Sequence, residues 1–339
     1  MVRVFSVLCC AIMLSLAFLA GSAKAAPVQL TVYTAVEPDM LKKYVEVFNK
    51  QHPDIRLTWV RDSAGPIISR LLAEKETPKA DAIFGLSVNG ILFLKENGLL
   101  KPHTPKDFDK ISTMMRDNSP EPHWVGMNAW VSALCVNTKL LEKEGLAMPQ
   151  SWADLVKPEY KGKIVMSNPA SSGTGFMAVW GWMQMWGKEK AWDYMEKLDK
   201  NVKMYVHSGS KPAAMAAQGE VLIGVSSPPY AYVFSQRKAP VESAIPSEGA
   251  AWDMEASALV WRGGTVTEEK QLALEALMNF SASREVSEIA AEGLYIPARI
   301  DVDVRPGAGT RESMIDMAAE QSALERDAVL REWRKRFEK

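Results

Sequence analysis

The stretch Trp124-Val-Gly-Met-Asn-Ala-Trp-Val-Ser-Ala-Leu-Cys-Val-Asn137 is rich in strand-forming residues, and so is Ala251-Trp-Asp-Met-Glu-Ala-Ser-Ala-Leu-Val-Trp261. Both are longer than an ordinary strand of about 5–6 residues. Each stretch is therefore predicted to leave one α/β unit and enter another. Two such crossings make the first lobe discontinuous in sequence, with the second lobe inserted in it. Paired crossing strands form a hinge that permits closure around a ligand.

Short strand–turn–helix units flank both stretches. Before Trp124, strands are expected at 28–33, 54–60 and 80–84 and helices at 37–51, 67–76 and 88–97. Between the stretches, strands are expected at 163–166, 203–206 and 221–225, and helices follow the loops 168–175 and 207–212. This alternation predicts an α/β fold, with two lobes joined by a two-strand hinge. The lobes are assigned to 26–126 and 127–255, and 256–339 completes the first lobe and adds C-terminal helices.

The composition is that of an ordinary globular protein. The 339 residues are 47% hydrophobic and 24% charged, with a formal net charge of −1 at pH 7. These values exclude a disordered or collagen-like chain. A near-neutral chain has no broad basic field, which argues against a nucleic-acid partner.

Residues 1–25 have the pattern of a secretory signal peptide. Arg3 supplies a positive charge, residues 4–20 are mostly apolar, and Ala23 and Ala25 have the spacing that signal peptidase needs. We expect cleavage after Ala25 or the next residue, and location in the periplasm. An uncleaved membrane anchor is the alternative. Cleavage would leave a single cysteine, so the mature chain is expected to form no intramolecular disulfide.

Ser, Thr and Gly dominate the loops that follow the predicted strands and open helices. In a parallel sheet such loops meet at one edge, where ligands bind. A helix N-terminus presents unpaired N–H groups and about +0.5 e of charge, so several together favour an anion. The candidate anion contacts are Ser63, Ser87, Ser171, Ser172, Gly173, Thr174, Ser208 and Ser210. The alternative for each hydroxyl is that it only caps its helix.

Acidic and aromatic residues border the same predicted cleft. Glu37 follows the first strand, and Asp253 and Glu255 alternate along the second long stretch, so at least one of these two is expected to face the ligand. Glu37, Asp253 and Tyr230 are candidate ligand contacts. A carboxylate beside an anion site indicates a zwitterionic solute, whose ammonium lies at the carboxylate or over an aromatic ring. A salt bridge or hydrogen bond in the hinge is the alternative role for these acids.

Motifs for other chemistries are isolated. Ser208 and Lys211 match S-x-x-K, but no K-T-G or S-D-N motif accompanies them, which argues against a serine hydrolase. The four histidines have no zinc-ligand spacing. Tyr230 and Tyr232 carry phenol groups that suit a hard cation, which keeps a ferric-ion-binding protein as an alternative.

Several motifs resemble those of one family. They are Leu30–Ala35, Val60–Ser63, Ser151–Leu155, Pro158–Val165, Asn168–Phe176, His207–Pro212 and Trp252–Ala256. On these residues the chain is similar to the 2-aminoethylphosphonate-binding subgroup of periplasmic substrate-binding proteins, relatives of the ferric-ion and polyamine binders. The resemblance covers nearly the whole chain after residue 25. It implies a type II periplasmic-binding fold that delivers a phosphonate to an ABC permease.

One loop departs from that family's pattern. An Asp-Tyr pair followed by a basic residue is expected after the strand at 221–225, but the chain has Ser226-Ser-Pro-Pro-Tyr230. The loop should face the cleft. Because an acid is missing there, another phosphonate or an organophosphate stays open as the ligand.

The leading hypothesis is a periplasmic solute-binding component of an ABC importer, not an enzyme. It captures 2-aminoethylphosphonate, or a related phosphonate or organophosphate, with helix N-termini and Ser/Thr hydroxyls. We expect a monomer without cofactor or bound metal, whose partners are this ligand and an ABC permease in the inner membrane. A ferric-ion-binding transport protein and an exported phosphoesterase are the alternatives. The hypothesis predicts that Thr174→Ala and Ser210→Ala weaken ligand binding without unfolding the protein.

Overall fold

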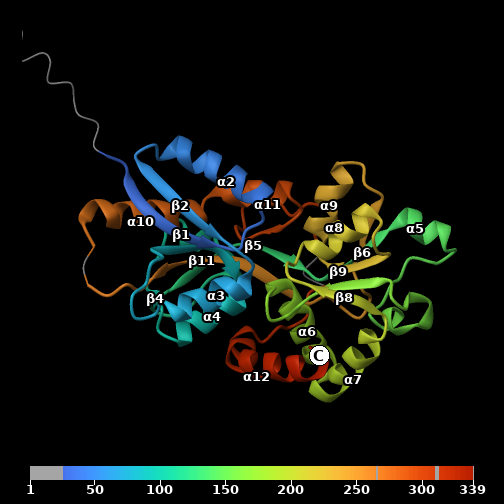
Figure 1. Cartoon of the computed structure of the whole chain (residues 1–339). Coiled ribbons are helices and arrows are strands. Elements are labelled where there is room, and N and C mark those ends of the chain that lie inside the picture. The colour runs from blue at the N-terminus through green and yellow to red at the C-terminus, as the bar shows by residue number, and fades with distance from the viewer. Residues whose placement is uncertain (1–25, 265, 310–312, 339) are drawn as a thin grey trace, which may run out of the picture.

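The computed structural model describes residues 26–264, 266–309 and 313–338, which form two α/β lobes side by side (Figure 1). The predicted signal peptide lies outside these residues. None of the helices in the described ranges is long and apolar enough to cross a membrane.

The first lobe is built on a seven-stranded sheet in the order β12-β5-β11-β3-β1-β2, with β4 paired to β11. Its strands are β1 (Val28–Thr34), β2 (Ile55–Arg61), β3 (Ala82–Ser87), β4 (Leu100–Lys101), β5 (Trp124–Val131), β11 (Trp252–Val260) and β12 (Ile296–Pro297). Helices α2 (Pro38–Gln51), α10 (Glu268–Ser281) and α11 (Arg284–Glu292) cover one face, and α3 (Ala64–Ala73) and α4 (Val88–Glu96) cover the other (Figure 1). Since both faces are covered, every residue of β5 is buried.

The second lobe is built on a five-stranded sheet in the order β10-β6-β9-β7-β8. Its strands are β6 (Ala133–Asn137), β7 (Ile164–Ser167), β8 (Val202–Val206), β9 (Ile223–Ser226) and β10 (Val241–Ala244). Helices α6 (Gly173–Trp186) and α7 (Lys188–Asp199) lie on one side, α8 (Lys211–Gln218) and α9 (Pro228–Gln236) on the other, and α5 (Thr138–Lys143) at the far end (Figure 1). Short 3-10 turns occupy Phe108–Lys110, Thr113–Met115, Ala153–Val156 and Pro158–Tyr160.

Parallel pairing within each sheet brings the functional loops together. β1 is parallel to β2 and β3, and β7 is parallel to β8 and β9. The loops that follow these strands therefore open at the edge of their sheet that faces the other lobe. The predicted α/β architecture with two lobes is confirmed.

The chain passes between the sheets at two neighbouring points. β5 ends at Val131 and β6 begins at Ala133, so the first crossing is at Ser132. The return lies between β10 and β11, and the N–H of Ser132 donates to the carbonyl oxygen of Ala251 at 2.7 Å. The two crossings form the hinge. The lobe boundaries at 126/127 and 255/256 stay a prediction; the strand pairings put the two changes of sheet at 132 and 245–251.

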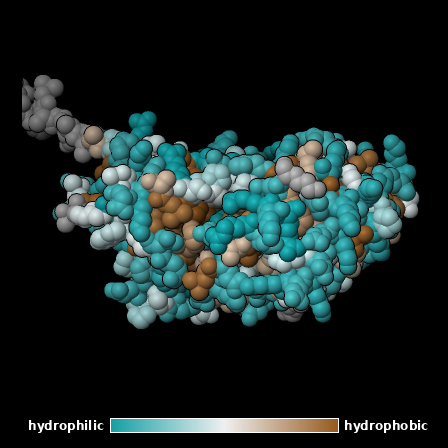
Figure 2. All heavy atoms as spheres, turned by 60° about the horizontal axis from the view of Figure 1, so that its bottom comes forward, coloured by the Kyte–Doolittle hydropathy of each residue, from teal (hydrophilic) through white to brown (hydrophobic). Residues whose placement is uncertain are grey.

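The C-terminal helix α12 (Ala319–Phe337) contacts both lobes along the bottom of the molecule (Figure 1). Ser322 donates to Asn89 on α4, while Trp333 packs edge-on against Tyr205 of β8 at 5.2 Å. Figure 2 turns this side forward and shows it as mostly hydrophilic, with apolar side chains gathered on the seven-stranded lobe. The helix α12 is therefore one of the predicted C-terminal helices, and it adds a third connection between the lobes.

Candidate functional site

A small cavity lies between the two lobes. Its volume is about 40 Å³. The first lobe lines it with Ala35, Glu37, Ser63, Ala64, Gly85, Ser87, Trp130 and Glu255, and the second with Ser172, Gly173, Thr174, Gly209 and Tyr230. It therefore occupies the position where open α/β sheets bind ligands.

Helix N-termini surround this cavity. Cap or first-turn residues of α2, α3, α4, α6 and α9 line it, and Gly209 lies just before α8. Each N-terminus contributes unpaired N–H groups and about half a positive charge. Within the described ranges no lysine or arginine lines the cavity. Backbone N–H groups are therefore the positive groups at its wall, beside the carboxyl groups of Glu37 and Glu255, and they favour a small anion at the helix starts.

Three buried serines begin helices at this cavity, and their hydroxyls have different partners. Ser172 caps α6, because its oxygen accepts from the N–H of Gly175 at 3.2 Å. Ser87 makes a hydrogen bond with the carboxylate of Asp253. Ser63 makes no side-chain capping bond to α3 in the described part of the chain. The hydroxyl oxygen of Ser172 therefore caps its own helix, which is the alternative role to ligand binding. The hydroxyl of Ser63 stays available to a ligand.

Two glycines keep the cavity walls close together. A Cβ on Gly209 would lie 2.4 Å from Oγ1 of Thr174 and 3.1 Å from Oγ of Ser172. A Cβ on Gly173 would lie 3.0 Å from Cβ of Ser87 on the opposite lobe. Gly209 therefore lets its loop lie against the start of α6 within the second lobe, and Gly173 lets the two lobes come this close.

Three contacts join the lobes around the cavity. The N–H of Gly65 donates to the carbonyl oxygen of Ser171 at 3.1 Å. His207 and Asp62 lie 3.2 Å apart, and Arg237 donates to Asp39 at 2.6 Å. These contacts show that the lobes are closed in this structure.

Two acids near the cavity have strong partners within the protein. The Oδ1 of Asp253 accepts from the N–H of Val88 at 3.1 Å, and its Oδ2 accepts from Nδ2 of Asn89 at 3.2 Å. Glu37 forms an ion pair with Arg61 at 2.9 Å. Burial raises the pKa of Asp253 to about 6 and also raises the pKa of Glu37, against which the charge of Arg61 acts.

The third acid, Glu255, has a weaker partner. Its Oε2 accepts a hydrogen bond from the neutral amide of Asn128 at 2.8 Å. Burial raises its pKa to about 7, and the charges of Glu37 and Asp253 act in the same direction. A buried carboxylate next to two other acids is costly to ionise, because little in the protein compensates its charge.

Aromatic rings complete the wall near Glu255. Trp130 and Tyr230 line the cavity, and the ring of Tyr295 meets Trp130 edge-on at 6.3 Å. Trp130 is 4% exposed, and its indole nitrogen has no hydrogen-bond partner among the described residues. Burial raises the pKa of Tyr230, so its phenol keeps its proton at neutral pH.

The predicted site residues divide into two groups. Those that line the cavity are Glu37, Ser63, Ser87, Ser172, Gly173, Thr174 and Tyr230. Ser171, Ser208, Ser210 and Asp253 lie outside it. Ser171 donates to the carbonyl oxygen of His207 at 2.8 Å, and the hydroxyl oxygens of Ser208 and Ser210 are 3.2 Å apart. The ligand-binding role of all these residues stays a prediction.

Sequence reasoning missed several lining residues. Gly85 and Gly209 carry no side-chain chemistry to single them out. Trp130 and Glu255 carried a signal as members of the two long stretches, but the prediction committed to Asp253 and not to Glu255. The structure has the opposite arrangement, with Glu255 at the cavity and Asp253 bound to the start of α4.

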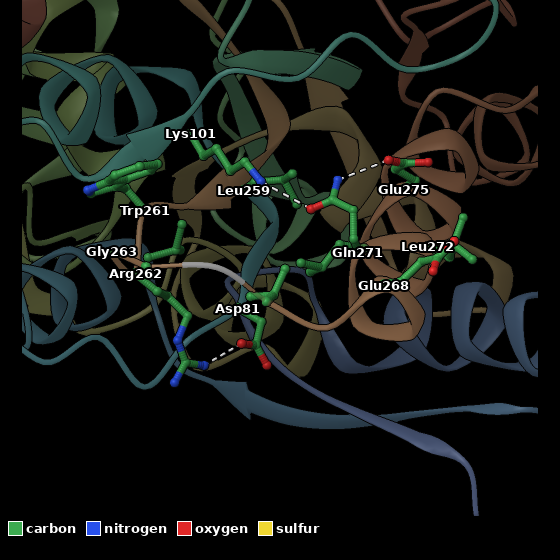
Figure 3. A pocket seen from close by; sticks show the side chains of 14 residues that line it. Asp81, Lys101, Leu259, Trp261, Arg262, Gly263, Glu268, Gln271, Leu272 and Glu275 are labelled. Atoms are coloured by element: carbon green, nitrogen blue, oxygen red, sulfur yellow. Dashed lines mark hydrogen bonds and ion pairs between the residues drawn. The ribbon is translucent and has the colours of Figure 1, made fainter. Parts of the chain in front are cut away.

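Larger openings, two of which border helices of the first lobe, lie outside this cavity. A groove of about 730 Å³ runs between α2, α9 and α11 and shares Glu37 and Tyr230 with the cavity. A pocket of about 570 Å³ lies beside β4 and α10 (Figure 3). There, Asp81 pairs with Arg262, and Gln271 joins Lys101 to Glu275, so the polar groups of this pocket bind one another.

The chain is similar in sequence to known bacterial solute-binding proteins. The model of a family described as bacterial extracellular solute-binding proteins matches residues 77–315. An uncharacterised protein of Haemophilus influenzae is 30% identical over 238 residues, 69% of this chain and 68% of the relative. A probable ABC transporter periplasmic-binding protein of Sinorhizobium fredii is 25% identical over 138 residues, 39% of this chain and 37% of the relative.

Solved structures share the architecture. The periplasmic binding protein AfuA from Actinobacillus pleuropneumoniae, solved with fructose-6-phosphate, has a TM-score of 0.84 at 25% identity and covers 91% of this chain and 98% of its own. Iron-bound HitA from Pseudomonas aeruginosa has a TM-score of 0.74 at 19% identity, covering 90% and 99%. These likenesses confirm the predicted type II periplasmic-binding fold. Because the family model matches most of this chain, residues 77–315, the chain belongs to the bacterial extracellular solute-binding proteins.

Proposed function

We propose that this protein is the periplasmic component of an ABC importer and captures a small phosphonate or phosphate, with 2-aminoethylphosphonate as the leading candidate. The observation that carries the proposal is the ring of helix N-termini around one closed cavity. A tetrahedral anion can accept hydrogen bonds from both lobes at once. Its binding would therefore favour the closed form, which the permease recognises.

Free donors at the cavity support an anionic head group. The N–H groups of Gly173 and Thr174 are in the first turn of α6 and have no intrahelical acceptor. The backbone hydrogen bonds of the described residues give them no other acceptor. Ser63 adds a hydroxyl from the opposite lobe.

The cavity size favours a small solute. A buried water needs about 10–15 Å³, and the cavity measures about 40 Å³. The likeness to AfuA, whose structure holds fructose-6-phosphate, supports a phosphorylated or phosphonate ligand. The volume of the cavity between the closed lobes favours a ligand whose part beyond the phosphate or phosphonate group is smaller than a hexose.

The ferric-ion alternative has less support from the geometry. Tyr230 lines the cavity, but Tyr232 does not and instead borders the groove outside it. Residues two apart on a helix point about 200° away from each other. The raised pKa of Tyr230, caused by burial, also opposes the phenolate that a ferric ion needs. A phosphoesterase stays the second alternative. Because the chain belongs to a family of solute-binding proteins, we favour ligand binding over hydrolysis of a phosphate ester.

Ser63→Ala and Thr174→Ala should each weaken phosphonate binding by roughly 10- to 100-fold, since one hydrogen bond to a charged group contributes about 1.5–3 kcal/mol. Isothermal titration calorimetry with 2-aminoethylphosphonate measures this. Ser171→Ala is the control, because that hydroxyl lies outside the cavity and is bound to a backbone carbonyl. Unchanged affinity in both cavity variants, with folding intact, would contradict the site.

A further inference from the structure

We propose that Glu255 is the counter-ion for an ammonium group of the ligand, so that the site selects aminated phosphonates over phosphonates without an amine. The proposal rests on the proposed function, because it assumes that the phosphonate group lies at the helix N-termini. The proposal states that the ligand carries a positive ammonium group at the end opposite its phosphonate.

The first argument comes from the partners of the three acids. Asp253 has two hydrogen bonds from the start of α4, and Glu37 has the guanidinium of Arg61. Glu255 has one neutral amide, that of Asn128, on Oε2. Its Oε1 accepts no hydrogen bond from the residues that the structure describes. Of the three, Glu255 is therefore the acid that has neither a cation nor a backbone N–H beside its charge in the described part of the chain.

The second argument is the position of Glu255. It is 6% exposed and lines the same cavity as Ser63 and Thr174. Gly85 lies next to it, since a Cβ at that position would lie 3.7 Å from Oε2 of Glu255 and 2.2 Å from Cγ2 of Val36. A carboxylate and an anion site in one cavity of about 40 Å³ require a ligand whose opposite charges are separated by a short spacer.

The third argument is the surrounding aromatic surface. Trp130 and Tyr230 line the cavity with Glu255, and Tyr295 packs against Trp130. An ammonium is attracted to the faces of such rings as well as to a carboxylate. Glu255 supplies an acid at the cavity, so the absence of an acid from Ser226–Tyr230 does not exclude an aminated ligand.

The test compares two probes that differ in the amine, 2-aminoethylphosphonate and ethylphosphonate, by calorimetry on the purified protein. The wild-type protein should bind the aminated probe at least about 10-fold more tightly. Glu255→Gln should weaken the aminated probe by about 10- to 100-fold and leave ethylphosphonate within about threefold, so that the preference disappears. Glu220→Gln, at an exposed acid, is the control and should keep the preference.

The outcomes separate this inference from the proposed function. If the wild-type protein binds both probes equally, or if Glu255→Gln keeps the full preference, the role of Glu255 is wrong and phosphonate binding stands. If neither probe binds the wild-type protein, the proposed function fails and this inference fails with it. The wild-type comparison needs no variant, so equal binding of the two probes would overturn the inference even if Glu255→Gln does not fold.

Discussion

Gly65→Ala is expected to fold as the wild-type protein does and to lose about 100-fold in ligand affinity. Gly65 lies in the first turn of α3, against the opposite lobe. A Cβ there would lie 2.1 Å from the carbonyl oxygen of Ala170 and 2.8 Å from Cα of Ser171. Backbone atoms cannot move aside within a lobe, so the lobes themselves must separate. In the open protein the clash is absent, so only the small cost of an alanine before Pro66 in the first turn of the helix is left.

The affinity falls because closure is part of binding. A ligand held by one lobe keeps the contacts with Ser63 or those with Thr174, but not both. Calorimetry gives the affinity, and small-angle X-ray scattering shows whether ligand still makes the variant more compact. We expect the scattering curve of Gly65→Ala to stay that of the open form at saturating 2-aminoethylphosphonate.

Gly90→Ala is the matched control. Its Cβ would lie 2.7 Å from Cδ1 of Ile68, inside the same lobe, so the crowding is the same in the open and closed forms. That variant should change the unfolding temperature and leave the affinity within about threefold. Wild-type affinity in Gly65→Ala would show that the ligand-bound lobes are farther apart than in this structure.

The architecture could be predicted because hydrophobic periodicity depends on local sequence. Strand–helix units at 28–51 and 54–76 appear close to their expected bounds. The loop at Ser226–Tyr230 shows where local reasoning failed. Its two prolines suggested a loop, but they occupy the first positions of α9, where proline loses no hydrogen bond. Tyr230 is therefore in the first turn of a helix that faces the cavity.

The type of site could be predicted from the sequence, but not which of its acids faces the cavity. Serines and glycines after parallel strands converge because topology brings those loops together. The choice between Asp253 and Glu255 depended on a contact distant in sequence, since the N–H of Val88 takes the carboxylate of Asp253. Alternation places both acids on one face of a strand and cannot say which one an approaching helix will bind.

Glu255→Gln is expected to stabilise the empty protein at about pH 8 by about 3 kcal/mol, and to have little effect at about pH 4.5. In the unfolded chain this carboxyl has its ordinary pKa of 4.5, whereas burial raises the pKa to about 7 in the folded protein. Below pH 4.5 both states hold the proton, so the carboxyl costs nothing. Between pH 4.5 and 7 the unfolded chain loses its proton while the folded protein keeps it. The folded protein therefore loses about 1.4 kcal/mol of stability for each unit by which burial raises the pKa, and the loss is complete above pH 7.

Urea unfolding of both proteins at the two pH values measures the effect. Asp253, whose pKa burial also raises, is present in both proteins, and the loss of its repulsion with Glu255 is part of the measured difference. Glu220→Gln, at an exposed acid, should show no such pH-dependent gain. An equal difference between Glu255→Gln and wild type at both pH values would mean that the carboxyl is not held in a costly site.

The same carboxylate should act in the opposite direction once an ammonium lies beside it. A bound cation compensates the buried charge, so the penalty on the ionised form falls. At saturating 2-aminoethylphosphonate and about pH 8, the wild-type protein should therefore gain more stability from the ligand than Glu255→Gln does. A carboxyl that weakens the empty protein and strengthens the occupied one is what a counter-ion requires, whereas a buried acid that does not touch the ligand would show only the first change.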